Sequence, residues 1–466
     1  MSEASDLAER TLAAAGPGEA MVSVTRERSL MMRFSRSRPT QATSVDDLTV
    51  EVAALREGHV GRAASNATDS EALQRCARTA VRLAEAAAGI AGAGDYPGFA
   101  LPAPVRGHEG HDPDTAALDP EHGGKALESA FAVARESHSE ASGMWTAAEV
   151  QSAIASSSGL SVTDRVTDAF VKVVAFEPGG RSGYASQTAV AAGSLDTGEV
   201  ARRAAEKATR GAHETESLPA GAYTVVMEPP AVHELLGVLA STAFNGLAHT
   251  ELRGALVDRL GSRVTSPAVN LSDSPRYAGT LPRSFDAEGV PKAPLPLIQD
   301  GVAHRVVHDT RSAALAGTSS TGHALAAGGD SDGPVPTNLV LIGGAATDEQ
   351  ELCEPIERGI YVTRLWYTNV VRPREALFTA VTRDGTFLIE DGLVTRRLDD
   401  MRVTDSALGM LGRLEALGQR PVLVSDGELY GRRFATGSVC PPVRIGAVSF
   451  TGSAALPQAR GAQPDR

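Results

Sequence analysis

The chain is poor in cysteine and has no long apolar run. Its three cysteines, Cys76, Cys353 and Cys440, lie far apart in a chain of 466 residues. An odd, sparse set of this kind excludes a disulfide framework and is typical of a reducing compartment. No uncharged apolar run reaches the roughly 18 to 20 residues of a membrane-spanning helix. The first residues carry acids where a secretory signal carries bases. The sequence therefore predicts a cytoplasmic location and no membrane partner.

Basic and aromatic side chains are too scarce for a nucleic-acid surface. The formal net charge is −13, and aromatic residues make up only 4% of the chain. Binding to nucleic acids normally needs a basic patch or stacking aromatic side chains, so we expect no nucleic-acid partner. Apolar residues at 42% and charged residues at 22% are typical of a globular protein with a sizeable core.

The first half of the chain alternates helical and strand patterns. We expect an N-terminal α/β domain over residues 1–90, with helices near both ends and an antiparallel sheet between them. Residues 90–120 are rich in Gly, Pro, Asp and His, which favours a connecting loop. A central domain over 120–213 follows, in which strands lie between two helices.

The second half, residues 220–455, is predicted to be a β-rich C-terminal domain. A strand at 223–227 leads to Pro229 and Pro230, which favour the first turn of a helix. Later strands and turns indicate a barrel- or sandwich-like architecture, interrupted by one helix over 406–417. The predicted fold class is therefore α+β.

One dipeptide has the residue types of a zinc peptidase helix. Such helices carry His-Glu and a second His about one turn later, so that both imidazoles face one metal ion and the Glu acts as base. His233 and Glu234 begin the pattern, but Gly237 and Val238 occupy the two positions open to the second ligand. We therefore expect a surface pair at a helix start.

Two other histidine groups are weaker metal candidates. His108, His111, Asp112 and Asp114 have suitable side chains, but they lie in a Pro- and Gly-rich segment that favours a solvated loop.

His304 and His308 lie in a segment with a strand pattern. A strand would separate them by about 13 Å, too far for one ion. A helix would bring the two imidazoles together, but the flanking residues favour the strand.

No complete nucleophile or nucleotide motif is present. The sequence contains no Gly-x-Ser-x-Gly elbow, Walker loop or Gly-x-Gly-x-x-Gly fingerprint. Ser182 and the hydroxyls of 318–322 are expected to bond nearby backbone. Cys440 is expected to be a buried bystander, and Asp286 and Glu288 to be turn acids. We therefore assign no catalytic, cofactor-binding or metal residue to the chain.

Several short segments together resemble one known family, the TldD/PmbA (TldD/TldE) metallopeptidases. Their order along the chain carries the resemblance more than any single segment does. The segments are RFSRSRPTQ (33–41), DDLTV (46–50), GAYTVVMEPP (221–230), FDAEG (285–289), SAALAGTSSTG (312–322), TNL (337–339) and RDGTFLIEDG (383–392).

The resemblance implies a particular role within that family. TldD-type members carry His-Glu-x-x-x-His and a C-terminal Cys that completes a zinc site, whereas TldE/PmbA-type members lack this set and act as the partner subunit. Here Val238 stands where the second His would be, and the surroundings of Cys440 resemble the closing strand of the TldE/PmbA type. The resemblance implies a TldE/PmbA-like subunit without its own metal, in a hetero-oligomer with a zinc-bearing TldD-like homologue.

The family also implies a substrate class, an unfolded peptide or a small amide-containing natural-product precursor. Two alternatives stay open. One is a self-sufficient amide hydrolase of the same fold with an unrecognised site, which metal in the purified chain would favour. The other is a binding or scaffold protein without a hydrolytic role. Co-purification with a TldD-like partner would favour the subunit hypothesis over both.

Overall fold

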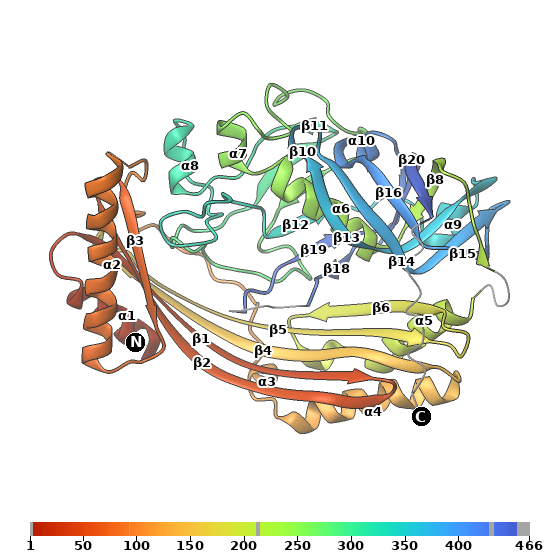
Figure 1. The fold of residues 1–466 in the computed structure, drawn as a ribbon, viewed down its shortest axis with the longest axis horizontal. Helices are drawn as coiled ribbons and strands as arrows, with labels where there is room; N and C mark the ends of the chain where they lie inside the picture. The colour runs from red at the N-terminus through yellow and green to blue at the C-terminus, as the bar shows by residue number, and fades with distance from the viewer. Residues whose placement is uncertain (1–2, 93, 211–214, 428–432, 454–466) are drawn as a thin grey trace, which may run out of the picture.

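The computed structural model describes residues 3–92, 94–210, 215–427 and 433–453 and has an α+β fold (Figure 1). A long, curved six-stranded sheet forms the first half, and two smaller sheets form the second half. None of the helices in these ranges is both long and apolar enough to cross a membrane.

The six-stranded sheet combines strands from two separate regions of the chain. Its order is β3-β2-β1-β4-β5-β6, and all its neighbours are antiparallel. Strands β1 and β4 pair continuously from Met21 opposite Ser156 to Phe34 opposite Gly143. Strand β6 forms one edge of the sheet. The strands are β1 (Glu19–Ser35), β2 (Arg38–Arg56), β3 (His59–Ser65), β4 (Glu140–Ser156), β5 (Ser161–Phe176) and β6 (Ser182–Ala189).

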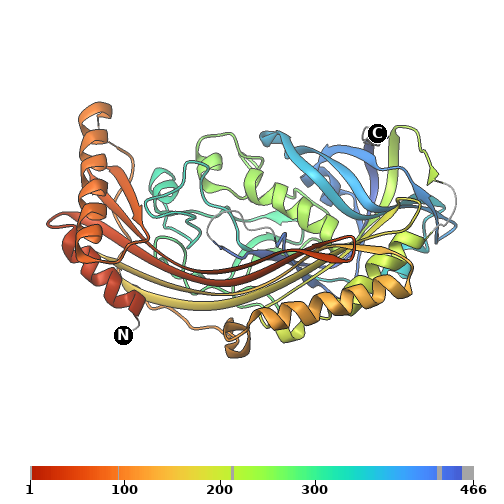
Figure 2. The same cartoon turned by 60° about the horizontal axis from the view of Figure 1, so that its bottom comes forward.

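Helices cover the six-stranded sheet on the face away from the second half of the chain and at one end. They are α1 (Glu3–Ala14), α2 (Ser70–Ala91), α3 (Pro113–Ala116), α4 (Pro120–Glu136) and α5 (Thr197–Thr209), with a 3-10 turn η1 (Ala192–Ser194). Asp69, Asp119 and Asp196 each precede a helix and accept a backbone N–H of its first turn, the favoured N-cap arrangement. Helices α4 and α5 pack together beneath the sheet (Figure 2).

The second half contains a sheet in the order β11-β10-β9-β12-β19-β18 and a larger sheet closed into a ring. In the larger sheet β13, β8, β20, β16 and β14 follow one another, and β13 also pairs with β14, so these five strands form a barrel. The smaller sheet is β9 (Leu271–Asp273), β10 (Leu295–Gln299), β11 (Val302–Ala303), β12 (Asn338–Leu341), β18 (Val422–Val424) and β19 (Gly437–Cys440). The larger is β7 (Thr215–Glu216), β8 (Gly221–Met227), β13 (Arg358–Arg372), β14 (Leu377–Glu390), β15 (Leu393–Leu398), β16 (Met401–Ser406), β17 (Leu414–Leu417) and β20 (Val443–Ser453).

One apolar helix, α6, forms the centre of the second half. Its buried residues Leu235, Leu236 and Leu239 belong to the largest hydrophobic core, which also includes residues from both sheets. The helices here are α6 (Pro229–Thr242), α7 (Gly246–Thr250), α8 (Thr310–Leu315), α9 (Glu349–Cys353) and α10 (Ala407–Gly412), with a 3-10 turn η2 (Pro373–Glu375).

The predicted helix over 406–417 is wrong in its second half. Helix α10 ends at Gly412, and Leu414–Leu417 forms strand β17 against β20. Gly409 and Gly412 weaken a helix here, and the pairing of Leu414 with Ile445 is a long-range contact that local propensity cannot supply. The domain boundaries 1–90, 120–213 and 220–455 stay a prediction; residues 213 and 454–455 lie outside the described ranges.

Candidate functional site

The start of helix α6 carries the predicted His-Glu pair. Glu228 precedes the helix, and Pro229 and Pro230 occupy its first positions, where a missing N–H costs nothing. Most of the helix is buried, but His233 and Glu234 lie on a stripe that reaches the surface. The His233 side chain is 16% exposed, so the pair is half-buried at the helix start rather than fully exposed as a surface pair would be.

His233 has a carboxylate partner rather than a second imidazole. Its Nε2 lies 3.4 Å from Oδ1 of Asp426, and its Nδ1 is buried without a hydrogen-bond partner. Burial lowers the pKa of His233, but the hydrogen bond and negative charge of Asp426 outweigh burial and raise it. Burial also raises the pKa of the neighbouring Glu234 carboxyl. His233 and Glu234 therefore form a half-buried polar pair, in which His233 has a carboxylate partner and no second imidazole.

The other residues expected of a zinc site do not fit a zinc ion. Val238 is 4% exposed and packs in the apolar core. The Cys440 thiol is buried and lies 3.5 Å from the Pro229 carbonyl oxygen, to which it donates. Burial raises the pKa of this thiol, which disfavours the thiolate that zinc needs. Within the described ranges, no group of three or more His, Cys, Asp and Glu side chains is placed to hold a metal.

A large cleft lies beside this helix start, between the six-stranded sheet and the second half of the chain. Its volume is about 1130 Å³. Strand β6 and the first turns of α5 form one side, and Glu228–Pro230, the loop 276–282 and strand β18 form the other. The cleft combines a sheet edge, a helix start and a loop, so it is the candidate site for a ligand.

A buried ion pair joins the two sides of the cleft. Glu228 Oε2 accepts from Nζ of Lys207 on α5 at 2.6 Å, and Lys207 also donates to the Tyr184 carbonyl of β6 at 3.0 Å. The other Glu228 oxygen accepts from the hydroxyl of Tyr361 at 2.9 Å. Burial lowers the pKa of Lys207, and the Glu228 charge offsets part of that effect. This contact fixes α5 relative to α6.

The loop that contains His108 and His111 is packed against the sheet, which corrects the predicted solvated loop. His108 Nε2 lies 2.9 Å from Asp164 Oδ1, and His111 Nε2 lies 2.9 Å from Glu149 Oε1. Asp112 instead caps α3 by accepting from the Thr115 N–H. The carboxylate partners come from β4 and β5, far away in sequence, so the loop sequence alone could not reveal them.

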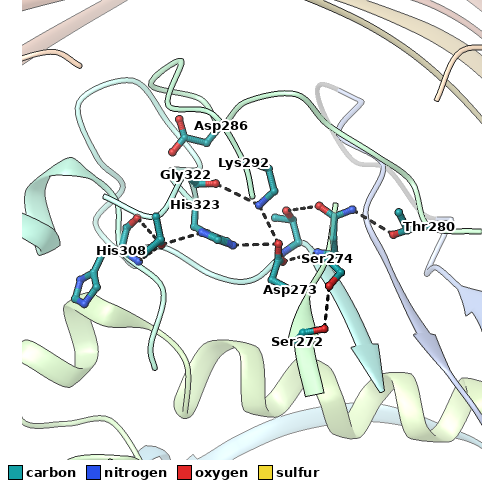
Figure 3. Close-up of polar contacts among 12 residues, drawn as sticks. Ser272, Asp273, Ser274, Thr280, Asp286, Lys292, His308, Gly322 and His323 are labelled. Carbon is teal, nitrogen blue, oxygen red and sulfur yellow. Dashed lines mark hydrogen bonds and ion pairs between the residues drawn. The ribbon is translucent and has the colours of Figure 1, made fainter. Parts of the chain in front are cut away.

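A buried network holds the cleft loop 276–282 in place (Figure 3). Asp273 Oδ1 lies 3.3 Å from Lys292 Nζ and 3.2 Å from His323 Nε2, and these side chains are at most 2% exposed. Asp273 Oδ2 accepts from the backbone N–H of Asn338 at 2.8 Å. Asn338 in turn donates to the Leu281 carbonyl at 2.6 Å. Burial opposes the charge of Asp273, but Lys292 and His323 lower its pKa below the usual value.

The predicted turn acids are more deeply buried than the sequence suggests. Asp286 accepts from the backbone N–H groups of Glu288, Val290 and Ala324, as expected for a turn. Glu288 is fully buried and accepts from the Tyr96 hydroxyl at 3.1 Å. Burial raises the pKa of both carboxyl groups, and the charge of Asp286 raises that of Glu288 further.

The remaining candidates have structural contacts. The prediction that His304 and His308 share a strand is wrong, because β11 ends at Ala303 and His308 is buried before α8 with its Nδ1 3.2 Å from the Ser312 hydroxyl. Thr321 bonds the His308 backbone, as predicted for the hydroxyl-rich turn. Ser182 instead donates to Asp384 at 2.6 Å, so it joins β6 to β14.

Sequence reasoning missed the two buried ionic groups. Asp273, Lys292 and His323 are separated by tens of residues, and so are Lys207 and Glu228. No local spacing connects them. The sequence signal for them is weak: Lys292 lies in the apolar segment 290–297, but Lys207 follows Glu206 in a segment that also carries arginines.

Comparison with known proteins assigns this architecture to a family of metallopeptidases. Three domain profiles match in order along the chain: PmbA/TldA metallopeptidase domain 1 at residues 20–84, the central domain at 113–211 and the C-terminal domain at 220–452. The chain therefore belongs to the PmbA/TldD metallopeptidase family, which confirms the resemblance of its sequence motifs.

Curated relatives match part of the chain. A metalloprotease of Methanothermobacter thermautotrophicus is 28% identical over 227 residues, which are 48% of this chain and 48% of that protein. A metalloprotease of Synechocystis is 26% identical over 203 residues, 42% of each. The matched part of the chain thus spans about half the length of these relatives.

Solved structures match nearly the whole fold. TldE from Thermococcus kodakarensis has a TM-score of 0.82 at 17% identity, covering 96% of this chain and 99% of that one. A solved structure from Thermotoga maritima has a TM-score of 0.80 at 21% identity, also covering 96% and 99%. At these identities the likeness establishes the fold.

Proposed function

We propose that this chain is a TldE/PmbA-like, zinc-free subunit of a heteromeric zinc metallopeptidase. Its partner in this proposal is a TldD-like homologue that carries the zinc site. The complex works in the cytoplasm and hydrolyses peptide or amide bonds in unfolded peptides or small natural-product precursors. Membership of the metallopeptidase family and the TldE-like fold support this assignment.

One observation carries the proposal: helix α6 keeps His233 and Glu234 but offers no second ligand. Val238 presents hydrocarbon to the core, and the Cys440 thiol faces the Pro229 carbonyl. A stable zinc site needs three or four ligands. We therefore assign to this chain the shaping of the cleft and the support of its partner, and no step of bond cleavage.

The test compares the chain alone with the chain mixed with a zinc-bearing TldD-like homologue. Elemental analysis of the dialysed chain should give far less than one zinc per protomer. A quenched fluorescent peptide should remain intact with the chain alone and should be cleaved in the mixture in a chelator-sensitive way. Exchange of both His233 and Cys440 for Ala should leave the mixed activity largely intact.

Matched controls separate the alternatives. Removing the second zinc histidine of the homologue should abolish the mixed activity. Chelator-sensitive turnover by the lone chain, lost on His233→Ala, would instead establish a self-sufficient hydrolase. If the homologue is equally active with and without this chain, the subunit assignment is wrong, and a binding or scaffold role for this chain becomes the favoured alternative.

A further inference from the structure

The hydroxyl of Tyr361 on β13 lies between two carboxyl groups. Its oxygen is 2.9 Å from Oε1 of Glu228 and 2.7 Å from Oε2 of Glu349. Tyr361 and Glu228 are buried, whereas Glu349 is half-buried in the first turn of α9. Of these three groups, Glu349 is therefore the one that water reaches.

The hydrogens at this contact do not suffice for two ionised carboxylates. A phenol hydroxyl has one hydrogen to donate, and an ionised carboxylate can only accept. If both acids were ionised, one contact would bring lone pairs together at 2.9 Å or less. A proton on one carboxyl group turns that contact into a second hydrogen bond, in which the carboxyl donates to the Tyr361 oxygen.

The contacts of the two acids place this proton on Glu349. Glu228 accepts from the Lys207 ammonium at 2.6 Å and from the Thr363 hydroxyl at 3.3 Å, and both donors favour its ionised form. The Glu349 carboxyl contacts no donor other than Tyr361 in the part of the chain that the structure describes. Burial raises the pKa of Glu349, and the negative charge of Glu228 raises it further.

The other charges around Glu349 do not reverse this assignment. Lys207 and Arg203, both on α5, lower the pKa of Glu349, but burial and Glu228 outweigh them, so that it stays above its usual value of 4.5. The titratable and charged groups around this contact are Arg203, Lys207 and Arg210 of α5, Glu228 before α6, Tyr361 of β13, Arg397 of β15, Arg444 of β20, and Asp348 and Cys353 beside Glu349.

Helix α9 covers an apolar cluster on the barrel, on the face opposite the largest core. It contacts β8, β15 and β20 (Figure 1). The cluster includes Leu352 and Cys353 of α9 and, from the strands, Val226, Tyr361 and Phe387. The contact between Glu349 and Tyr361 joins the first turn of α9 to the strand beneath it. Loss of this bond therefore loosens the helix over the cluster.

We propose that Glu349 is a proton-operated latch: protonated, it donates to Tyr361, which donates to Glu228, and loss of the proton releases α9 from the barrel. The proton leaves to water from the half-buried Glu349, and Tyr361 keeps its hydrogen bond to Glu228. The two carboxylates then repel each other across one hydroxyl. The latch is closed below the pKa of the unfolded glutamic acid and opens as the pH rises through the higher pKa of the folded chain.

Infrared difference spectroscopy locates the proton in the full chain. Subtracting the spectrum of Glu349→Gln from that of the unmodified chain isolates the bands of this one carboxyl group. The matched control is Glu354→Gln, an exposed acid in the same segment. The acid C=O band of Glu349 should persist to a higher pH than that of Glu354. Disappearance of both bands at the same pH overturns the proposal.

Hydrogen exchange measures the release of α9. Protection at residues 349–354, corrected for the pH dependence of intrinsic exchange, should fall about tenfold as the pH rises, the effect of losing one good hydrogen bond. Glu349→Gln should show no such fall, because its amide can donate to Tyr361 at every pH. Glu354→Gln should fall like the unmodified chain. An equal fall with and without Glu349, or no fall in the unmodified chain, overturns the proposal.

Arg203 supplies a test that a purely structural role of Glu349 would not pass. Its positive charge lowers the pKa of Glu349, so Arg203→Gln should move the loss of protection at α9 to higher pH. The matched control is Arg202→Gln, the neighbouring exposed arginine, which pairs with Glu199 and Glu206. A midpoint that moves equally in both variants, or in neither, overturns the assignment of this titration to Glu349.

Discussion

Arg433 clamps the carboxylate of Asp168 with two parallel hydrogen bonds, although the two residues belong to opposite halves of the molecule. Nε lies 2.9 Å from Oδ1 and Nη2 lies 2.5 Å from Oδ2. The same guanidinium donates to the Thr146 hydroxyl at 2.9 Å. Bidentate, charge-assisted pairs of this kind are about twice as strong as hydrogen bonds between neutral groups. The segment before β19 is thereby fixed to the face of the six-stranded sheet.

Loss of Arg433 should destabilise the chain strongly. Arg433→Met leaves the Asp168 carboxylate buried without its cation, which should cost about 3 to 5 kcal/mol in the free energy of unfolding. Arg75→Met, which removes an exposed pair with Glu71, should cost no more than about 1 kcal/mol. Urea unfolding measures both. Adding Asp168→Asn to Arg433→Met should recover part of the lost free energy of unfolding, because the buried charge is removed. Equal losses in Arg433→Met and Arg75→Met would contradict a stabilising contact between Arg433 and Asp168.

Glu288 should make the chain less stable as the pH rises. Its pKa is raised from 4.5 to about 8, so the folded chain keeps a proton that the unfolded chain loses from about pH 4.5 upward. The stabilisation is therefore complete below pH 4.5 and disappears as the pH rises through about 8. Glu288→Gln, which mimics the protonated group, should flatten this decline.

The measurement is the urea midpoint at several pH values between 4.5 and 8.5. Asp286, whose pKa is also raised, should leave part of the slope in the variant. The same exchange at the exposed Glu9 serves as the control and should leave the slope unchanged. An unchanged slope in Glu288→Gln would show that this carboxyl is already ionised in the folded chain.

Lys292 should keep the cleft loop rigid. Lys292→Met removes a cation from buried Asp273, which should cost about 3 to 5 kcal/mol and loosen the network that holds Asn338 and Leu281. Hydrogen exchange should accelerate at residues 274–282 and stay unchanged in the β13–β14 ladder. Exposed Lys125→Met is the control. Equal hydrogen exchange at residues 274–282 in both variants would show that Lys292 does not stabilise the loop.

The Cys440 thiol should be unreactive in the native chain. It is buried and its pKa is raised by burial, so the reactive thiolate is scarce. An aromatic disulfide reagent should label all three cysteines rapidly in urea and Cys440 only slowly without it. Rapid, stoichiometric native labelling of Cys440, located by mass spectrometry, would contradict the buried position.

The sequence predicted the helix starts and strands that depend on residues close to one another in the chain. Pro229 and Pro230 mark the start of α6, and the regular apolar spacing of Leu235 and Leu239 continues it. Acidic N-caps such as Asp69 mark other helix starts. These signals act within a few residues, so the helix starts and long strands of the α+β fold could be recognised from them.

The parts that sequence reasoning missed depend on partners distant in the chain. His111 is held by Glu149, and Lys292 by Asp273, yet neither histidine nor lysine shows in its own segment that such a partner exists. Strand β17 likewise forms only because it pairs with β20, about thirty residues further along the chain. The His-Glu dipeptide singled out the half-buried His233, but its pairing with Asp426 emerged only from the fold.

Because β1 pairs with β4 along its length, a chain cut between these two strands should yield two fragments that can reassemble into one sheet. Fourteen consecutive residue pairs join strands that lie on either side of residues 94–112. A protease that cut the backbone there would leave two pieces joined along the middle of one sheet, so the nicked chain would still migrate as a single particle under native conditions. Expressed separately, the two pieces would each expose an unpaired strand, β1 in one and β4 in the other, and each would be the other's most complementary surface.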